Sequence, residues 1–148
     1  MGKSSKHGAR ARAHARRLAL QGLYQWQLSG ASAGDIITQL YASQSLKTTD
    51  TDYFEELLHQ AIADSNELDT AFSPYLDRPL TQLDPIERAI LLLSTYELKA
   101  RPDVSYRVVL NEAVELAKSF GAEQSHKYIN AVLDKTAAEL RKAERGAG

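Results

Sequence analysis

The sequence contains no cysteine, and this absence excludes several kinds of chemistry at once. Neither disulfides nor thiolate metal sites can form, and no cysteine nucleophile is available. Long apolar runs are missing too: none approaches the roughly 18 to 20 residues that a membrane-spanning helix requires. The basic N-terminus is not followed by the apolar stretch of a secretory signal. We therefore expect a soluble cytoplasmic protein with no membrane association.

Signatures of catalysis are also lacking. The chain has no Gly-x-Ser-x-Gly, no Walker loop and no Gly-x-Gly-x-x-Gly motif. Ser125 and His126 are neighbours, but adjacent helical residues point about 100° apart and cannot form a nucleophile–base pair. These absences predict a binding protein that is not an enzyme and uses no cofactor.

Acidic residues are missing from residues 1–34, which carry a net charge of +6, whereas the remaining 114 residues carry −7. A basic arm at residues 1–17, which includes Lys3 and Lys6, therefore precedes an acidic body. This asymmetry suggests a polyanionic partner. A solvated terminus that only improves solubility is the alternative interpretation.

The hydrophobic pattern has helical period throughout, and no two-residue alternation is evident. A chain of 148 residues fits one domain or two small subdomains. Asp52 and Glu55 have the spacing of a capping box, which predicts a helix start there. The expected fold is an all-α globule of about seven mostly short helices, with early helices over residues 35–42, 52–62 and 68–75.

The clearest helix start lies at residues 84–87, where Asp84 suits the N-cap and Pro85 the first helical position. The apolar run 86–98 predicts a central helix buried nearly all round, ending by Arg101 because Pro102 follows. Gly121 is well placed to close the next helix as its C′ residue. A last helix is expected over 123–142, and residues 141–148 are expected to fray.

Two Glu-x-x-His spacings, Glu56–His59 and Glu123–His126, match four of the six side-chain ligands of a di-iron helical bundle. Those ligands must lie in mid-helix and face a bundle core. Glu123 and His126 instead fall in a first helical turn, where an acid is explained by the helix dipole. Glu56 lies beside the apolar stripe, so a metal site is disfavoured, although a di-iron protein stays an alternative.

The arm carries arginines whose planar donor forks match phosphate geometry. In a helix, Arg10, His14 and Arg17 share one face, while Arg12 and Arg16 share the opposite face. One flat surface cannot meet both faces, so the arm either unwinds around its ligand or is gripped from two sides. The helix that follows is expected to be anchored in the core by Leu20, Leu23, Trp26 and Leu28.

Two further groups combine cations with aromatic rings, on which single-stranded bases stack. One group surrounds the helix junction at Gly121, and the other pairs Tyr75 with Arg78. Together with the arm they favour single-stranded RNA or DNA over a duplex, for which no recognition helix is evident. The junction group comprises Lys118, His126, Lys127 and Tyr128.

Four segments carry a specific resemblance: ALQGLYQWQL (19–28), YEL (96–98), NEAVELAKSFG (111–121) and HKYINAVLDK (126–135). They resemble the NusB family of bacterial transcription antitermination factors, over nearly the whole chain from Arg10 to Arg141. The resemblance implies subdomains at about 18–78 and 80–142. It also implies binding of the boxA element of nascent ribosomal RNA together with the ribosomal protein NusE, to help RNA polymerase resist termination.

The resemblance also implies the site residues. Tyr24 and Glu87 would contact NusE, although core packing of Tyr24 and helix capping by Glu87 are alternative roles. Two departures leave the contact register of the arm open: His14 and alanines dilute the arginine run, and Gln124 stands where some relatives have an acid. The implied RNA contacts are Arg10, Arg12, Arg16, Arg17, Tyr75, Arg78, Lys118, Gln124, His126, Lys127 and Tyr128.

Two other functions remain possible at this point. The same helical fold heads some RNA-cytosine methyltransferases, but a chain of 148 residues has no room for a catalytic domain and lacks a glycine-rich cofactor loop. A helical protein–protein adaptor with an incidental basic tail would need no RNA.

Overall fold

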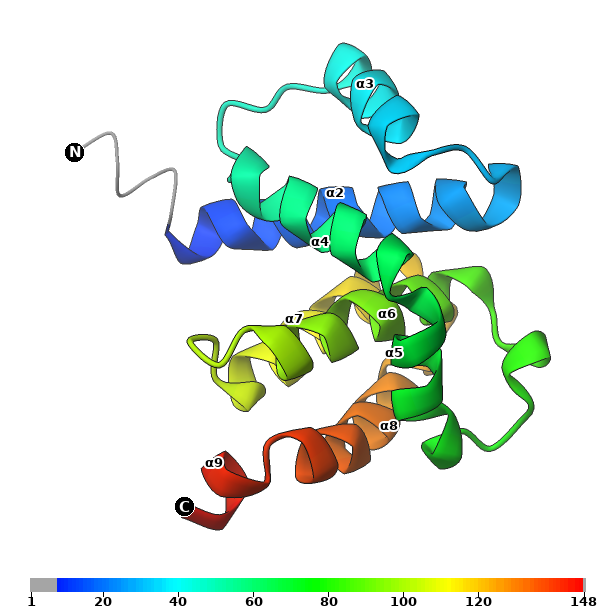
Figure 1. The fold of residues 1–148 in the computed structure, drawn as a ribbon, viewed down its shortest axis with the longest axis vertical. Helices are drawn as coiled ribbons and strands as arrows, with labels where there is room; N and C mark the ends of the chain where they lie inside the picture. Colours follow the sequence, from blue (N-terminus) through cyan, green and yellow to red (C-terminus); the bar gives the residue numbers. More distant parts are fainter. Residues whose placement is uncertain (1–7, 148) are drawn as a thin grey trace. The chain divides into compact units, whose positions relative to one another are not determined.

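The protein is all-helical, as predicted (Figure 1). The computed structural model describes residues 8–147, so Lys3 and Lys6 of the predicted arm lie outside the described residues. Within that range no strand occurs, and a short final helix brings the number of α-helices to eight rather than about seven. The helices are α2 (Ala9–Ser29), α3 (Ala33–Ser43), α4 (Thr51–Ala63), α5 (Ser65–Phe72), α6 (Pro85–Ala100), α7 (Tyr106–Phe120), α8 (Ser125–Leu140) and α9 (Lys142–Ala147), with 3-10 turns η1 (Ser73–Tyr75) and η2 (Leu80–Gln82).

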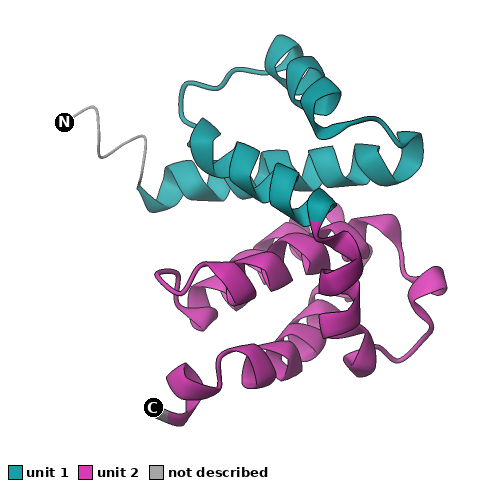
Figure 2. Cartoon of the chain, in the orientation of Figure 1, with its two compact units in different colours: residues 1–63 teal, residues 64–148 magenta. Residues whose placement is uncertain are grey.

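The chain divides into two compact units, residues 1–63 and 64–148 (Figure 2). The sequence-based boundary near residue 79 was therefore too late. The reason is packing, because α5 lies against α6 and α8, and η1 also contacts α8. Pro74 and Pro79 interrupt helices inside the second unit and do not mark a linker between the units.

The first unit is built on α2, which packs along α4 and also contacts α3 (Figure 1). Leu20, Leu23 and Phe54 are fully buried in it, as the apolar pattern predicts. The expected anchoring role of Leu28 is wrong, since this side chain is 62% exposed. Trp26 is only half-buried.

The start of α4 corrects a predicted cap. Asp52 was expected to cap this helix with Glu55, but Asp50 does so: its carboxylate accepts from the Tyr53 backbone N–H at 3.1 Å. The Asp50 backbone N–H in turn donates to the Ala11 carbonyl at 3.1 Å, which fixes the helix start against α2. Both aspartates satisfy the local preference for an N-cap, and the contact with α2 favours the earlier one.

The second unit has α6 as its central helix, in contact with α5, α7 and α8. Asp84 caps α6 as predicted, accepting from the backbone N–H groups of Ile86 and Glu87 at 2.7 and 3.3 Å. Residues 89–98 are all buried, and the helix ends at Ala100 ahead of Pro102. This burial on every face explains why the run carries no amphipathic stripe.

Gly121 does close α7, but not in the left-handed conformation that a C′ glycine adopts. Its backbone is extended, with φ −88° and ψ 173°, and its N–H donates to the Ala117 carbonyl at 2.8 Å. Glycine is needed here for space, because a Cβ would lie 2.8 Å from the same carbonyl oxygen. The next helix begins at Ser125, so Glu123 precedes it rather than starting it.

The C-terminal tail was predicted to fray, and this is wrong for the described residues up to 147. Arg141 is buried, and its guanidinium donates to the carbonyls of Leu98, Glu97 and Arg101 at 2.6, 3.1 and 2.9 Å. Glu97 and Leu98 lie in the last turn of α6, and Arg101 directly follows it. The Glu97 and Arg101 carbonyls also accept from the backbone N–H groups of Arg101 and Val104, both at 3.0 Å. A single arginine therefore ties the tail to the end of the central helix, and α9 follows it.

Candidate nucleic-acid interface

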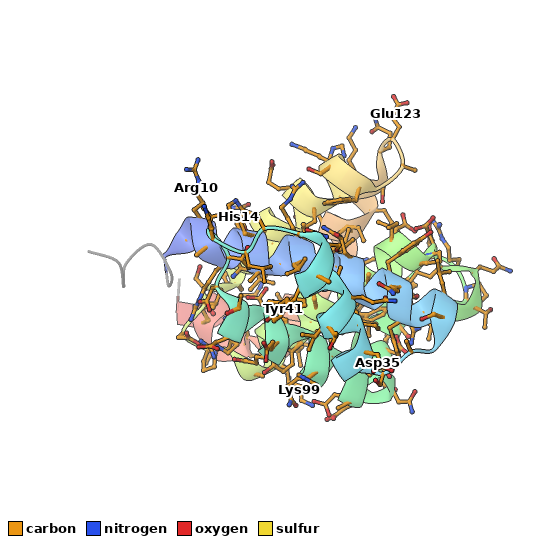
Figure 3. All side chains as sticks on the ribbon, turned by 90° about the horizontal axis from the view of Figure 1, so that it is seen from above. Arg10, His14, Asp35, Tyr41, Lys99 and Glu123 are labelled. Atoms are coloured by element: carbon orange, nitrogen blue, oxygen red, sulfur yellow. The ribbon has the colours of Figure 1, made fainter. Side chains whose placement is uncertain are left out.

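One face of α2 carries exposed cations of the first unit, and Lys47, between α3 and α4, is also exposed. Arg10 and Arg17 are exposed and His14 is half-buried, and the spacing of the three residues puts them on one side of the helix. Arg10 and His14 extend from this side in Figure 3. The Nδ1 atom of His14 lies 3.0 Å from the Thr48 carbonyl oxygen and 2.9 Å from its hydroxyl, so the ring orientation is fixed by the segment before α4.

The opposite face of α2 turns inward. The guanidinium carbons of Arg12 and Arg16 lie 4.3 and 5.7 Å from the ring centroid of Tyr53 on α4. Arg16 is 3% exposed and Tyr53 is also buried, while Arg12 is half-buried. A guanidinium over an aromatic face is attracted by the ring quadrupole, and burial strengthens the attraction.

This arrangement differs from both sequence-based expectations for the arm. From Ala9 onward the segment is a regular helix, so it is not unwound. Its second arginine face is covered by the protein itself and is not left for a ligand to bind. One of the two arginine faces of α2, that of Arg12 and Arg16, packs against Tyr53 of α4. In the described structure, the face of Arg10, His14 and Arg17 is the one open to a polyanion.

A second basic group lies in the other unit, around the junction of α7 and α8. Lys118 and Lys127 are exposed, and His126 is half-buried. Lys118 lies 3.8 Å from Glu115, a long ion pair one helical turn away, which leaves the ammonium in solvent. Lys118 and Lys127 thus present exposed charge on either side of the turn between α7 and α8.

Gln124 stands out at this junction because its φ is +70°. It is the one non-glycine residue with a positive φ in residues 8–147, and it immediately precedes the first turn of α8. A left-handed conformation costs a side-chain-bearing residue about 1–2 kcal/mol. Such strain is often held at functional sites, where it re-aims a side chain.

The cation–aromatic pair predicted for Tyr75 and Arg78 is wrong in its aromatic partner. The guanidinium carbon of Arg78 lies 4.4 Å from the ring centroid of Tyr128, on α8. The same guanidinium donates to the Asp77 carboxylate at 2.6 Å, and the Tyr128 hydroxyl accepts from the Asp77 backbone N–H at 3.3 Å. Tyr75 lies half-buried in η1.

Contacts within the Asp77–Arg78–Tyr128 cluster, together with burial, shift the pKa values of Asp77 and Tyr128. The hydrogen bond from Arg78, above all, lowers the pKa of Asp77 below its usual value. Burial, above all, raises the pKa of the Tyr128 phenol. At neutral pH the cluster therefore presents a paired carboxylate, a guanidinium stacked on an aromatic ring and a protonated phenol.

The two residues expected at the NusE surface differ in exposure. Tyr24 is 38% exposed on α2, one turn before the exposed Leu28, so together they form a small apolar patch. Glu87 is 8% exposed, and its carboxylate accepts from the Ser125 hydroxyl at 2.8 Å. Glu87 therefore joins the start of α8 to the start of α6 and does not turn back to cap its own helix.

The structure brings no metal ligands together in the part of the chain that it describes: no group of three or more His, Asp or Glu residues could hold an ion. His59 is exposed on α4, and Glu123 lies outside a helix. No helix among the described residues is long and apolar enough to cross a membrane.

The NusB family profile matches residues 13–138, which include most of each unit, His14 and Arg17 of the basic face of α2, and the whole junction group. The transcription antitermination protein NusB of Alcanivorax borkumensis is 54% identical over 134 residues, covering 90% of this chain and 89% of the relative. The chain belongs to the NusB family. NusB of Xanthomonas axonopodis pv. citri is 49% identical over 152 residues, covering 99% of this chain and 96% of the relative.

Solved NusB structures share the fold. A NusB structure from T. maritima is 28% identical, with a TM-score of 0.73 over 86% of this chain and 91% of that one. A crystal structure of the antitermination factors NusB and NusE in complex with dsRNA matches with a TM-score of 0.77, covering 89% of this chain and 99% of that one. At 24% identity the second match supports the fold alone.

Three features of this NusB-family chain were not found from its sequence. Tyr53 receives the inward arginines, Asp77 pairs with Arg78, and Ser125 binds Glu87. Tyr53 and Ser125 contact residues at least 37 positions away in the chain, and Asp77 lies in a loop without helical periodicity. Spacing rules could therefore not reveal these contacts. The inward face was signalled only by Ala11 and Ala15, small residues that let α2 approach α4 closely.

Proposed function

We propose that the protein is a cytoplasmic transcription antitermination factor without catalytic activity. It binds the boxA element of nascent ribosomal RNA together with NusE, and the assembly helps RNA polymerase resist termination. The observation that carries this proposal is the family membership, with relatives near 50% identity that are transcription antitermination proteins. A NusB protein of the same fold has been crystallised with NusE and dsRNA, and we extend these two kinds of partner to this chain through its family membership.

The geometry favours a division of roles among the candidate RNA contacts. Arg10 and Arg17 in the first unit, and Lys118 and Lys127 in the second, are exposed cations that can reach phosphates. Arg12 and Arg16 hold α2 against Tyr53 and so position the exposed face. We assign the remaining contacts to Tyr75, Arg78, Gln124, His126 and Tyr128, and the NusE contacts to Tyr24 and, through the start of α6, Glu87.

The test is a titration of fluorescently labelled boxA RNA at several salt concentrations, with and without NusE. If the exposed Arg10, Arg17, Arg78, Lys118 and Lys127 each meet a phosphate of a single strand, the log–log salt slope should be about −3.5. NusE should strengthen the binding. No binding under either condition, or a slope near zero, would leave the adaptor function instead.

A matched pair of lysines controls for general charge loss. Lys118 and Lys142 are both exposed and both lie one turn from a glutamate, at 3.8 and 3.1 Å. Lys118→Ala should weaken RNA binding and make the salt slope shallower by about 0.7, whereas Lys142→Ala should leave both unchanged. A parallel titration with boxA RNA annealed to its complement distinguishes single-strand from duplex binding.

A further inference from the structure

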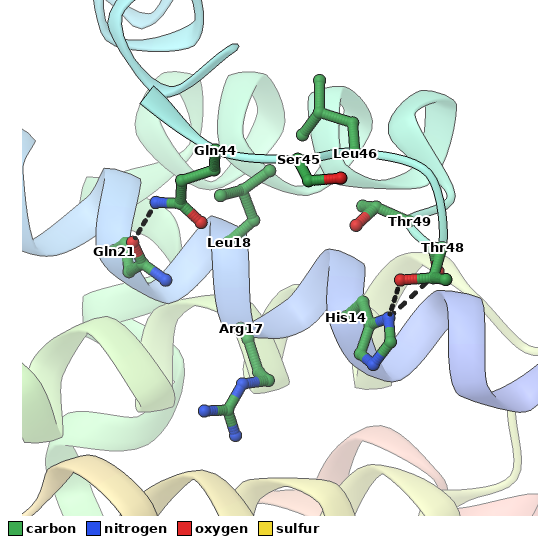
Figure 4. Close-up of a pocket in the computed structure, with 9 residues that line it drawn as sticks. All are labelled: His14, Arg17, Leu18, Gln21, Gln44, Ser45, Leu46, Thr48 and Thr49. Atoms are coloured by element: carbon green, nitrogen blue, oxygen red, sulfur yellow. Dashed lines mark hydrogen bonds between the residues drawn. The ribbon is translucent and has the colours of Figure 1, made fainter. Parts of the chain in front are cut away.

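A small polar pocket in the first unit lies beside the exposed cations of α2 (Figure 4). Its volume is about 170 Å³, below the roughly 300 Å³ at which drug-sized ligand pockets begin. The pocket can therefore hold only one small planar or polar group. Residues of α2 and of the segment between α3 and α4 line it: His14, Arg17, Leu18, Gln21, Gln44, Ser45, Leu46, Thr48 and Thr49.

The charge of the lining suits a polyanion. None of the nine described residues that line the pocket is acidic, whereas two other cavities of the described structure contain Asp69 and Asp35. Arg17 lines the pocket, and its guanidinium points away from the loop that carries Ser45 (Figure 4). A phosphate attached to a group inside the pocket would meet this guanidinium.

Two glutamines of the pocket lining offer a hydrogen-bonding edge. The amide of Gln44 donates to the Oε1 atom of Gln21 at 2.7 Å, which holds both amides in place. Within residues 8–147, this pairing leaves the Gln21 amide N–H₂ and the Gln44 carbonyl oxygen without a protein partner. A donor beside an acceptor is the pattern that glutamine uses to read a base edge.

The rest of the pocket lining includes two leucines and the imidazole ring of His14. Leu18 is buried and Leu46 half-buried, and both line the wall, so a flat ring can contact hydrocarbon while its edge reaches the amides. His14 is held by Thr48 through Nδ1, and its Nε2 has no partner among the described residues. The imidazole thus offers a further polar contact at the rim.

We propose that this pocket binds one unpaired RNA nucleotide, with the base against the Gln21–Gln44 pair and its phosphate on Arg17. The inference rests on the proposed RNA binding and extends it from the arm to the segment that precedes α4. It gives the first unit a base-selective contact in addition to its phosphate contacts. A pocket that reads a base edge also requires that nucleotide to be unpaired.

The experiment uses a set of boxA RNAs in which each nucleotide in turn is replaced by an abasic one. For the wild-type protein with NusE, one position should lose at least about fivefold in affinity through this pocket. In Gln44→Ala this loss of affinity should largely disappear, because the variant no longer contacts the base and therefore binds intact and abasic RNA about equally. The same penalty in Gln44→Ala as in the wild type overturns the proposal.

Another glutamine pair supplies the matched control. Gln25 on α2 donates to Gln39 on α3, outside the pocket, so Gln39→Ala breaks the same kind of bond between α2 and the helix that directly precedes Gln44. This variant should keep the abasic penalty of the wild type. Loss of the penalty in both variants would show that loosening α3, and not the pocket, is responsible, and this also overturns the proposal.

A second measurement separates failure of the pocket from failure of RNA binding. AMP, CMP, GMP, UMP and ribose 5-phosphate are titrated while the side-chain amide resonances of Gln21 and Gln44 are followed by NMR. At least one nucleotide should shift these resonances more than ribose 5-phosphate does. Equal resonance shifts with the nucleotides and with ribose 5-phosphate would indicate a site that binds phosphate alone. No shift with any of these compounds would indicate a pocket that binds no nucleotide, and either result overturns the proposal. Shifts with a nucleotide but no binding of boxA RNA would contradict only the proposed function.

Discussion

Arg16 lies buried beside Tyr53, with its guanidinium carbon 5.7 Å from the centroid of the phenol ring. Arg12 stacks on the same ring at 4.3 Å, so one aromatic side chain receives two cations. A cluster of arginines that suggests an RNA-binding arm in the sequence therefore contains two residues that pack within the protein. The remaining arginines are left on a defined, outward face.

The first prediction concerns the stability that this packing provides. Arg16→Ala should lower the free energy of unfolding by about 2 kcal/mol, since it removes a desolvated cation–π contact and the packing of the arginine stem. Arg10→Ala, on the exposed face, should change it by less than about 0.5 kcal/mol. Urea unfolding followed by circular dichroism measures both.

The RNA affinities of the same two variants should rank in the opposite order. Arg10→Ala should weaken boxA binding, and Arg16→Ala should do so only in proportion to its unfolded fraction. A stable Arg16→Ala protein with strongly weakened RNA binding would contradict the packing role and restore Arg16 as a direct contact.

The second prediction concerns the tail that was expected to fray. Arg141→Met keeps the aliphatic stem but removes the charged donor shared by the carbonyls of Glu97, Leu98 and Arg101, of which those of Glu97 and Arg101 keep a backbone donor. Hydrogen bonds from a charged donor to buried acceptors contribute about 1.5–3 kcal/mol, so a loss near 3 kcal/mol is expected. Amide exchange at the end of α6 should become faster as well.

Arg145 is the control for this prediction. It donates to Asp134 at 2.9 Å and lies 5.0 Å from the centroid of the Tyr106 ring, and such partly exposed contacts contribute about 1 kcal/mol or less each. Arg145→Met should therefore be close to the wild type. If both variants lose the same stability, α9 as a whole, and not the capping by Arg141, holds the tail.

The third prediction concerns acid pH. The Glu144 carboxylate accepts from the Tyr106 backbone N–H at 3.0 Å, and this bond, with help from Arg141, lowers the pKa of Glu144 below its usual value of 4.5. A carboxylate with a lowered pKa in the folded state stabilises the protein above its unfolded-state pKa. That contribution is lost as the pH falls through the lowered pKa.

Glu144→Gln should therefore destabilise the protein at neutral pH and flatten the loss of stability below about pH 4.5. Glu139→Gln is the control, because Glu139 forms only an exposed pair with Lys142. Denaturant titrations at a series of pH values give the curves. A Glu144→Gln curve parallel to that of the wild type would contradict the assignment.

The extent to which the sequence predicted these features depends on the range of the interaction. Asp84 and Pro85 act within one helical turn, so the start of α6 was predicted to the residue. Asp50 and Asp52 satisfy the same local rule, and only the contact of Asp50 with Ala11 on α2 decides between them. Local patterns therefore predicted the helices but not every cap.

The candidate site shows the same limit. Exposure of Lys118 and Lys127 follows from helical position, whereas the partner of Arg78 depends on how α8 packs against η1. Arg141 was assigned to a frayed tail because arginine is usually solvated, and its three carbonyl acceptors lie about 40 residues earlier in the chain. Long-range packing can give a charged residue a buried role that composition does not indicate.

The last prediction uses the left-handed backbone of Gln124. Gln124→Gly relieves the strain at φ +70° and should raise the free energy of unfolding by about 0.5–1 kcal/mol, because glycine adopts this conformation readily. Gln124→Ala keeps the strain and removes only the amide, so its stability should stay near that of the wild type. Thermal and urea unfolding measure the difference.

RNA binding by these two variants identifies what the strain provides. If the turn aims the Gln124 amide at RNA, both variants should lose about fivefold in affinity, which corresponds to one hydrogen bond of about 1 kcal/mol. Gln124→Gly would then be more stable and yet bind more weakly. Wild-type affinity in both variants would show that the amide makes no RNA contact, and the left-handed turn would then serve only to start α8 after Gly121.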